Sequence, residues 1–175
     1  MTGAFAEGEI AAESIAEYVA DHDFVPLDRF NALEEVEHYF KNPRGLYSTN
    51  ELEEAMQQSM DEYAGGIRSN YRYTDAQLQT ATAHIDRIEK LSVGLRAESM
   101  YDLLKIYELR ERLTVCRVLI EHLKARRETR WHCFAEHGDY PDRDPNFDCF
   151  INSRLVDGKV EIILRPLDQS HMPAT

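Results

Sequence analysis

The chain has 175 residues, 43% of them hydrophobic, which suits one compact domain with an apolar core. Its 32 acidic and 20 basic residues give a formal net charge of -12, so most of the surface would repel a phosphate backbone and no nucleic-acid partner is expected. The apolar runs are too short to cross a bilayer and the N-terminus has no signal-peptide pattern, so we expect no membrane insertion and a cytoplasmic location.

The first segment, 1–47, is predicted to form a helix followed by a connector. Apolar residues recur at three- and four-residue steps between Phe5 and Val19, with glutamates between them, as on an amphipathic helix. The pattern then loosens around prolines and Gly45, although apolar spacing at 30–40 indicates a short second helix. Because the apolar face of the first helix has no evident cover, formation of a homodimer is an alternative for this segment.

The segment 48–130 is predicted to form an antiparallel three-helix bundle. Ser48 and Glu51 make a capping-box pattern that begins one helix, and Thr74 with Gln77 begins the next. A third helix continues to Ala125 or beyond. Narrow apolar stripes on three helices are buried most simply against one another. The stripes consist of Leu52, Met56, Ser59, Met60 and Tyr63; of Leu78, Ala81, Ile85 and Ile88; and of Ile106, Leu109, Leu113, Cys116, Ile120 and Leu123.

The last segment, 131–175, is predicted to hold a turn-rich loop and a β-hairpin. The loop lies at 139–145, and Asp157-Gly158 separates two runs that are typical of strands. Two strands alone are marginally stable in water, so the hairpin must pack on another surface. The expected fold class is therefore mainly α: an antiparallel three-helix bundle with an extra N-terminal helix and a C-terminal β-hairpin.

No catalytic motif is present in the sequence. It contains no glycine-rich dinucleotide loop, no Walker loop, no HExxH, no CxxC and no GxSxG, so we assign no catalytic residue. The cysteines, Cys116, Cys133 and Cys149, are odd in number and follow no framework spacing, which favours reduced thiols.

Two polar stretches leave alternatives open. His132, Cys133 and His137 could ligate a metal in a small metal-dependent enzyme, but five-residue spacing between the histidines does not place them on one helical face. A packed loop is the simpler interpretation, and no metal is expected. Arg127 or Arg130 could bind an anion, although a basic run at a helix C-terminus already offsets the helix dipole.

Two neighbouring stretches resemble a known family. The sequences are RETRWHCF at 127–134 and DYPDRD at 139–144. Both are similar to the C-terminal domain of succinate dehydrogenase and fumarate reductase flavoproteins. Trp131, where succinate dehydrogenases carry a glycine, makes the adenylylsulfate reductase alpha subunit the nearest branch. The resemblance extends upstream through the predicted bundle and downstream to Arg165-Pro166-Leu167.

The opening residues 3–12, GAFAEGEIAA, resemble the last helix of the same family's FAD-binding domain, commonly GSFTEGRIAA. In the family this helix directs its N-terminus at the flavin, where free N–H groups and the positive dipole end favour negative charge. The resemblance therefore implies that Gly3, Ala4 and Phe5 are cofactor-binding residues. Ala4 stands where the family has serine, so only backbone donors would serve here.

The resemblance implies that this chain corresponds to the C-terminal part of a larger FAD-dependent oxidoreductase. The dinucleotide-binding unit and the domain that supplies substrate ligands have no counterpart in the sequence. We therefore expect FAD in the parent enzyme but none held by this chain alone, and a structural and subunit-docking role without catalysis. The implied partners are the FAD-binding domain and an iron–sulfur electron-transfer subunit. The alternative is a free-standing helical protein-interaction module.

Overall fold

In a computed structural model of the chain, the described residues are 2–23, 32–43, 45–130, 135–145 and 147–167. The chain divides into two compact units, Met1–Glu34 and Glu35–Thr175. The first unit contains helix α1 (Thr2–Asp21), and α2 (Ala32–Lys41) crosses the boundary into the second. The predicted segments 1–47, 48–130 and 131–175 remain a prediction about domain organisation.

Helix α1 confirms the predicted N-terminal helix. Its large apolar side chains lie mostly in solvent. Helices in water are normally stabilised by burial of their apolar face against other elements, and the apolar face of α1 is largely exposed. The exposed side chains are Phe5, Ile10, Ile15, Tyr18 and Val19.

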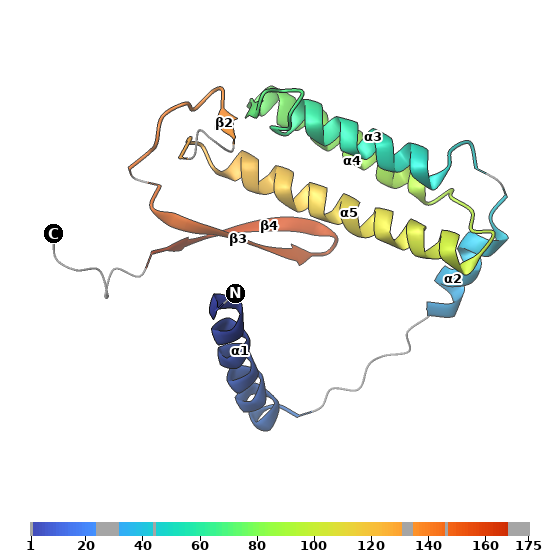
Figure 1. The fold of residues 1–175 in the computed structure, drawn as a ribbon, viewed down its shortest axis with the longest axis horizontal. Helices are drawn as coiled ribbons and strands as arrows, with labels where there is room; N and C mark the ends of the chain where they lie inside the picture. Colours follow the sequence, from blue (N-terminus) through green and yellow to red (C-terminus); the bar gives the residue numbers. More distant parts are fainter. Residues whose placement is uncertain (1, 24–31, 44, 131–134, 146, 168–175) are drawn as a thin grey trace. The chain divides into compact units, whose positions relative to one another are not determined.

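The second unit is built on the predicted antiparallel bundle of α3 (Thr49–Tyr63), α4 (Asp75–Ser92) and α5 (Met100–Ala125) (Figure 1). Each helix packs against the other two. The apolar stripes supply the core, which confirms the bundle prediction and removes most of their surface from water. The fully or nearly buried members of these stripes are Leu52, Met56, Leu78, Ala81, Ile85, Ile88, Ile106, Leu109, Leu113 and Ile120.

Capping residues fix where these helices begin. The Ser48 hydroxyl accepts a hydrogen bond from the Glu51 N–H (3.3 Å), and the Glu51 carboxylate accepts one from the Ser48 N–H (2.7 Å). Thr74 caps α4 by accepting from the Gln77 N–H at 3.2 Å. These side chains satisfy N–H groups that have no partner within the first helical turn. Helix α3 ends before Gly65, whose φ of +83° suits glycine.

Helix α2 packs at the start of α5. Tyr39 is 3% exposed, and its carbonyl accepts a hydrogen bond from the Ala97 N–H at 2.9 Å. The Arg110 guanidinium lies over the rings of Tyr39 and Tyr107 and pairs with Glu35. Burial raises the pKa of the Tyr39 hydroxyl. The short second helix predicted from apolar spacing is therefore part of this unit's packing.

A short parallel pairing, absent from the prediction, joins β1 (Arg72–Tyr73) to β2 (Glu136–His137). The Glu136 N–H donates to the Tyr71 carbonyl and the Gly138 N–H to the Tyr73 carbonyl, both at 2.7 Å. Strands of two residues are too short to produce a readable alternation of apolar and polar residues. This pairing holds the segment after α5 against the start of α4.

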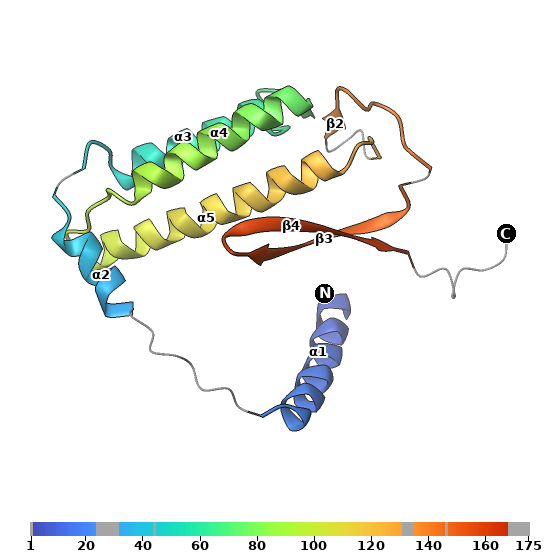
Figure 2. The ribbon, with the colours of Figure 1, turned by 180° about the vertical axis from the view of Figure 1, so that it is seen from behind.

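The C-terminal hairpin is formed by β3 (Cys149–Val156) and β4 (Lys159–Pro166), as predicted. Asp157 and Gly158 have φ of 49° and 74°, as a tight two-residue turn requires. The hairpin lies along α5 (Figures 1 and 2). His122 Nε2 and Ser153 Oγ are hydrogen-bonded at 2.9 Å, so Ser153 marks the face of the hairpin that is turned toward α5.

Within the described ranges, no helix is both long enough and apolar enough to span a membrane.

Candidate functional site

The three residues expected to approach a flavin, Gly3, Ala4 and Phe5, lie at the start of α1. The Phe5 side chain is 79% exposed. No acidic residue occupies the first turn of α1, so no carboxylate of that turn offsets the positive end of the helix dipole. This end of the helix is therefore compatible with a negatively charged ligand group.

The segment after α5 is organised around a buried carboxylate. Glu128 is 2% exposed and lies between the guanidinium groups of Arg126 (2.6 Å) and Arg130 (2.5 Å). Its second oxygen accepts a hydrogen bond from the Asp144 N–H at 3.0 Å. A buried carboxylate is tolerated only with such partners. We call these four residues, Arg126, Glu128, Arg130 and Asp144, the Glu128 cluster.

Arg130, considered from the sequence as an anion ligand, contacts groups of the chain itself. Besides Glu128, it donates to the Phe147 carbonyl (2.6 Å) and pairs with Asp148 (3.1 Å). Arg127 is exposed, with its guanidinium 5.7 Å from the centre of the Tyr140 ring. The guanidinium of Arg130 is thus paired with carboxylates of the chain itself, where the anion hypothesis would place a bound ligand.

Thr129 extends this network to strand β2. It is 2% exposed, and its hydroxyl donates to the Tyr140 carbonyl and accepts from the His137 N–H, both at 2.9 Å. Its own N–H donates to the Asp142 carbonyl at 3.1 Å. The motif Glu128-Thr129-Arg130 therefore holds residues 137–144 and 147–148 in place, which is a structural role.

His137 is the most enclosed ionisable side chain of this region. It is fully buried between the rings of Tyr73 and Tyr140, with centroids 4.8 and 4.7 Å away. Its Nδ1 accepts a hydrogen bond from the Asp139 N–H at 3.3 Å, and its Nε2 lies 3.4 Å from Asp75 Oδ1. Burial raises the pKa of the neighbouring Tyr73 hydroxyl.

The residues His132 and Cys133, considered with His137 as metal ligands, lie outside the described residues. The structure brings His137 together with Asp75 and Asp139 instead, and one ligand atom from each lies within 4.8 Å of the others. Sequence reasoning missed this set because Asp75 and Asp139 are 64 positions apart and meet only through the pairing of β1 with β2.

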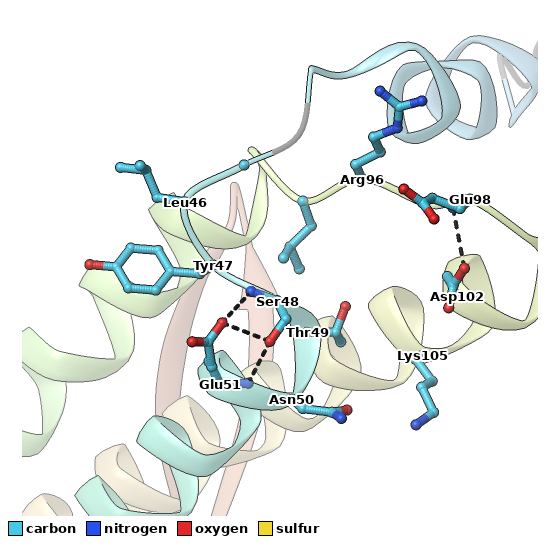
Figure 3. A pocket seen from close by; sticks show the side chains of 12 residues that line it. Leu46, Tyr47, Ser48, Thr49, Asn50, Glu51, Arg96, Glu98, Asp102 and Lys105 are labelled. Carbon is cyan, nitrogen blue, oxygen red and sulfur yellow. Dashed lines mark hydrogen bonds between the residues drawn. The ribbon is translucent and has the colours of Figure 1, made fainter.

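A hollow at the start of α3 is lined by residues 45–51 and by Arg96, Glu98, Asp102 and Lys105 (Figure 3). Figure 3 shows that the carboxylates of Glu51 and Asp102 are bound to backbone N–H groups of the chain. These helix starts are thus already occupied by capping carboxylates, and the hollow is open to solvent.

A second depression lies between α3 and α4, with Leu52, Ala55 and Ile88 among its lining residues. Ser59 Oγ and His84 Nδ1 are 3.1 Å apart at its edge. A serine nucleophile needs a histidine whose other nitrogen is held by a third group, and within the described residues no hydrogen bond to His84 Nε2 is observed. This pair therefore does not form a catalytic triad in the described part of the chain.

The sequence matches the family model described as "Fumarate reductase flavoprotein C-term" over residues 53–175. The chain belongs to this family. The match confirms the resemblance found in the sequence and covers the bundle from residue 53 onward, the Glu128 cluster and the hairpin. Residues Gly3, Ala4 and Phe5 lie outside the matched range, so their role as flavin ligands stays a prediction.

Two curated proteins are similar to this family member. The adenylylsulfate reductase subunit alpha of Megalodesulfovibrio gigas is 27% identical, with 91% of this chain and 27% of that protein covered. An uncharacterized FAD-dependent oxidoreductase of Methanocaldococcus jannaschii is 25% identical, with 77% of this chain and 24% of that protein covered. The chain thus spans about a quarter of the length of these relatives.

Solved structures share the fold. The adenylylsulfate reductase of Archaeoglobus fulgidus superposes with a TM-score of 0.84 at 23% identity, covering 98% of this chain and 30% of that chain. The quinol fumarate reductase of E. coli gives a TM-score of 0.75 at 18% identity, covering 95% and 29%. The arrangement of bundle and hairpin is therefore a shared feature of these structures.

Proposed function

We propose that this chain is the C-terminal part of a FAD-dependent oxidoreductase of the adenylylsulfate reductase and fumarate reductase type. Its role is structural and docking, and it carries out no catalysis alone. The observation that supports this most is the family match over 53–175. The described hollows add support, because neither combines enclosure with convergent ionisable groups, as an active site requires.

In the proposed enzyme, FAD is held mainly by the portion that precedes the bundle. The start of α1, at Gly3, Ala4 and Phe5, contributes backbone N–H groups to the flavin. The exposed apolar face of α1 packs on the flavin-binding portion. A flavin contacted by one helix end alone would remain mostly in water, so this chain by itself holds none tightly.

The proposed docking face combines α5 with the hairpin. Leu155 and Leu164 lie on the same side of the hairpin as Ser153, which faces α5, yet they are 61% and 53% exposed. On α5, Val115 and Leu119 are also exposed. One helix is too narrow to cover a two-stranded face, so further apolar surface must complete it. The partners proposed here are the flavin-binding portion and an iron–sulfur electron-transfer subunit.

A homodimer formed through α1 is a second proposal for the chain when it is isolated, because the same apolar side chains would then lack a cover. Size-exclusion chromatography of the chain with and without residues 1–22 tests it. A shift from dimer to monomer on truncation supports the proposal, and a monomer in both cases contradicts it. A free-standing interaction module is not favoured, given the family membership.

Co-purification tests the proposed function. The FAD-binding portion of the proposed enzyme is expressed together with this chain as a separate tagged polypeptide. We expect stoichiometric recovery of both with bound flavin, measured by absorbance. The variant Leu155→Lys should lower the recovery, because it places a charge in the docking face. The matched control is Leu46→Lys, at a side chain that precedes α3 and is 94% exposed, and this variant should leave the recovery unchanged. Failure of the two wild-type polypeptides to associate contradicts the proposal.

A further inference from the structure

One nitrogen of the His137 imidazole, Nε2, has no hydrogen-bond partner among the described residues. The imidazole is fully buried, and Nε2 is the one buried side-chain nitrogen or oxygen in the described ranges that has no hydrogen-bond partner. Buried polar atoms in folded proteins are nearly always paired, so an orphan of this kind requires an explanation. A bound ion would give Nε2 a partner, and the surrounding groups include further ligands for one.

A carboxylate lies close to Nε2, at a separation that suits two ligands of one ion. Asp75 Oδ1 lies 3.4 Å away, a contact that does not meet hydrogen-bond geometry. Two ligand atoms that each lie about 2.1 Å from a tetrahedral ion are about 3.4 Å apart. Asp139 completes a set of one imidazole and two carboxylates.

Access and charge favour a cation at this position. The side chain of Asp75 is 39% exposed and Asp139 is exposed, so an ion can enter from solvent and retain water as a further ligand. The two carboxylates each have an oxygen within 4.8 Å of the other, and Asp139 Oδ2 also accepts a hydrogen bond from the Asp75 N–H at 2.7 Å. A cation would offset the repulsion between them.

We propose that Asp75, His137 and Asp139 bind one first-row divalent cation, such as Zn²⁺, through His137 Nε2 and the two carboxylates. Imidazole with carboxylate is a donor set that suits these ions and does not suit Mg²⁺ or Ca²⁺. The ion fastens the start of α4 to strand β2, so its role is structural. The proposal is independent of the proposed oxidoreductase function.

Binding requires a proton to move within the imidazole. Because Nδ1 accepts from the Asp139 N–H, the neutral ring carries its proton on Nε2. When the ion takes the Nε2 position, the ring's single proton moves from Nε2 to Nδ1, and the 3.3 Å hydrogen bond from the Asp139 N–H is lost. The Asp139 peptide must therefore shift when the ion binds, which gives a local signal besides affinity.

Calorimetric titration of the metal-free chain with Zn²⁺ tests the site. We expect one site whose affinity falls about tenfold or more in Asp75→Asn and in Asp139→Asn, each of which keeps a side-chain oxygen. Asp157→Asn, in the hairpin turn, is the matched control and should bind as the wild type does. Circular dichroism of each variant verifies the fold, and Mg²⁺ should give no binding.

Nitrogen chemical shifts separate this site from adventitious binding at other histidines. Zn²⁺ should change the His137 Nε2 shift to that of a metal-bound imidazole and move the Asp139 amide resonance. The proposal is overturned if Zn²⁺ does not bind, if Asp75→Asn and Asp139→Asn bind as tightly as the wild type, or if the His137 nitrogens do not respond.

Discussion

Glu128 is the side chain on which the segment after α5 most depends. Its carboxylate holds two guanidinium groups and one backbone N–H while fully excluded from solvent. Glu128→Gln removes the negative charge and leaves two cations around a neutral group. Loss of one partner from a buried ion pair typically costs about 3–5 kcal/mol of unfolding free energy. We expect a loss approaching that range in urea unfolding followed by circular dichroism.

The control for Glu128 is Glu108→Gln. Glu108 also pairs with an arginine, Arg112, but at 3.6 Å and with both side chains nearly half exposed. Surface pairs contribute about 0–1 kcal/mol, so this change should have little effect. Equal effects of the two substitutions would show that burial of Glu128 does not matter.

Cys116 illustrates how burial controls reactivity. Desolvation raises the pKa of its thiol above the ordinary value, which lowers the fraction of reactive thiolate at neutral pH. We expect iodoacetamide to modify Cys116 several-fold more slowly in the folded chain than in urea, as measured by mass spectrometry of the Cys116 peptide. Equal rates in the two states would contradict this expectation.

At the scale of helices, the capping box of α3 links stability to pH. Hydrogen bonds from the Ser48 N–H and hydroxyl lower the pKa of Glu51 below its ordinary value of 4.5. A lowered pKa in the folded state contributes stability above pH 4.5 that is lost as pH falls through the folded-state pKa. Glu51→Gln should therefore reduce stability at pH 7 and flatten the decline on the acid side. Urea unfolding at several pH values measures both effects, and an unchanged acid decline would contradict the assignment.

The bundle itself depends on its central stripe. Leu109 is fully buried on α5, whereas Leu104 on the same helix is 54% exposed. Leu109→Ala should lower the free energy of unfolding by about 2–5 kcal/mol through lost burial and a residual cavity. Leu104→Ala, the matched control, should cost about 0.5 kcal/mol or less. Similar losses at both positions would argue against a core centred on Leu109.

Features that depend on neighbouring residues could be predicted from the sequence, and features that depend on contacts between distant segments could not. Capping boxes, apolar stripes and the Asp157-Gly158 turn are local patterns, so the bundle and the hairpin were predicted from sequence and confirmed. The pairing of β1 with β2 and the meeting of Asp75 with His137 depend on distant segments, for which no local spacing exists. The partners of Glu128 could not be predicted either, because a Glu between arginines is equally typical of a solvated surface.

At the scale of the whole molecule, the chain is a family member that spans about a quarter of its curated relatives. The apolar side chains of α1 and the hairpin remain in solvent here, as on a surface that completes its packing with another part. Under the proposed function, the bundle is a self-supporting body, and the flavin site is one that the start of α1 is proposed to share with the flavin-binding portion.

The most direct measurement is a titration of the purified chain with FAD, followed by flavin fluorescence anisotropy. Because one helix end encloses little of a flavin, the proposed function predicts no saturable binding at equimolar protein. Tight one-to-one binding by the isolated chain would contradict it.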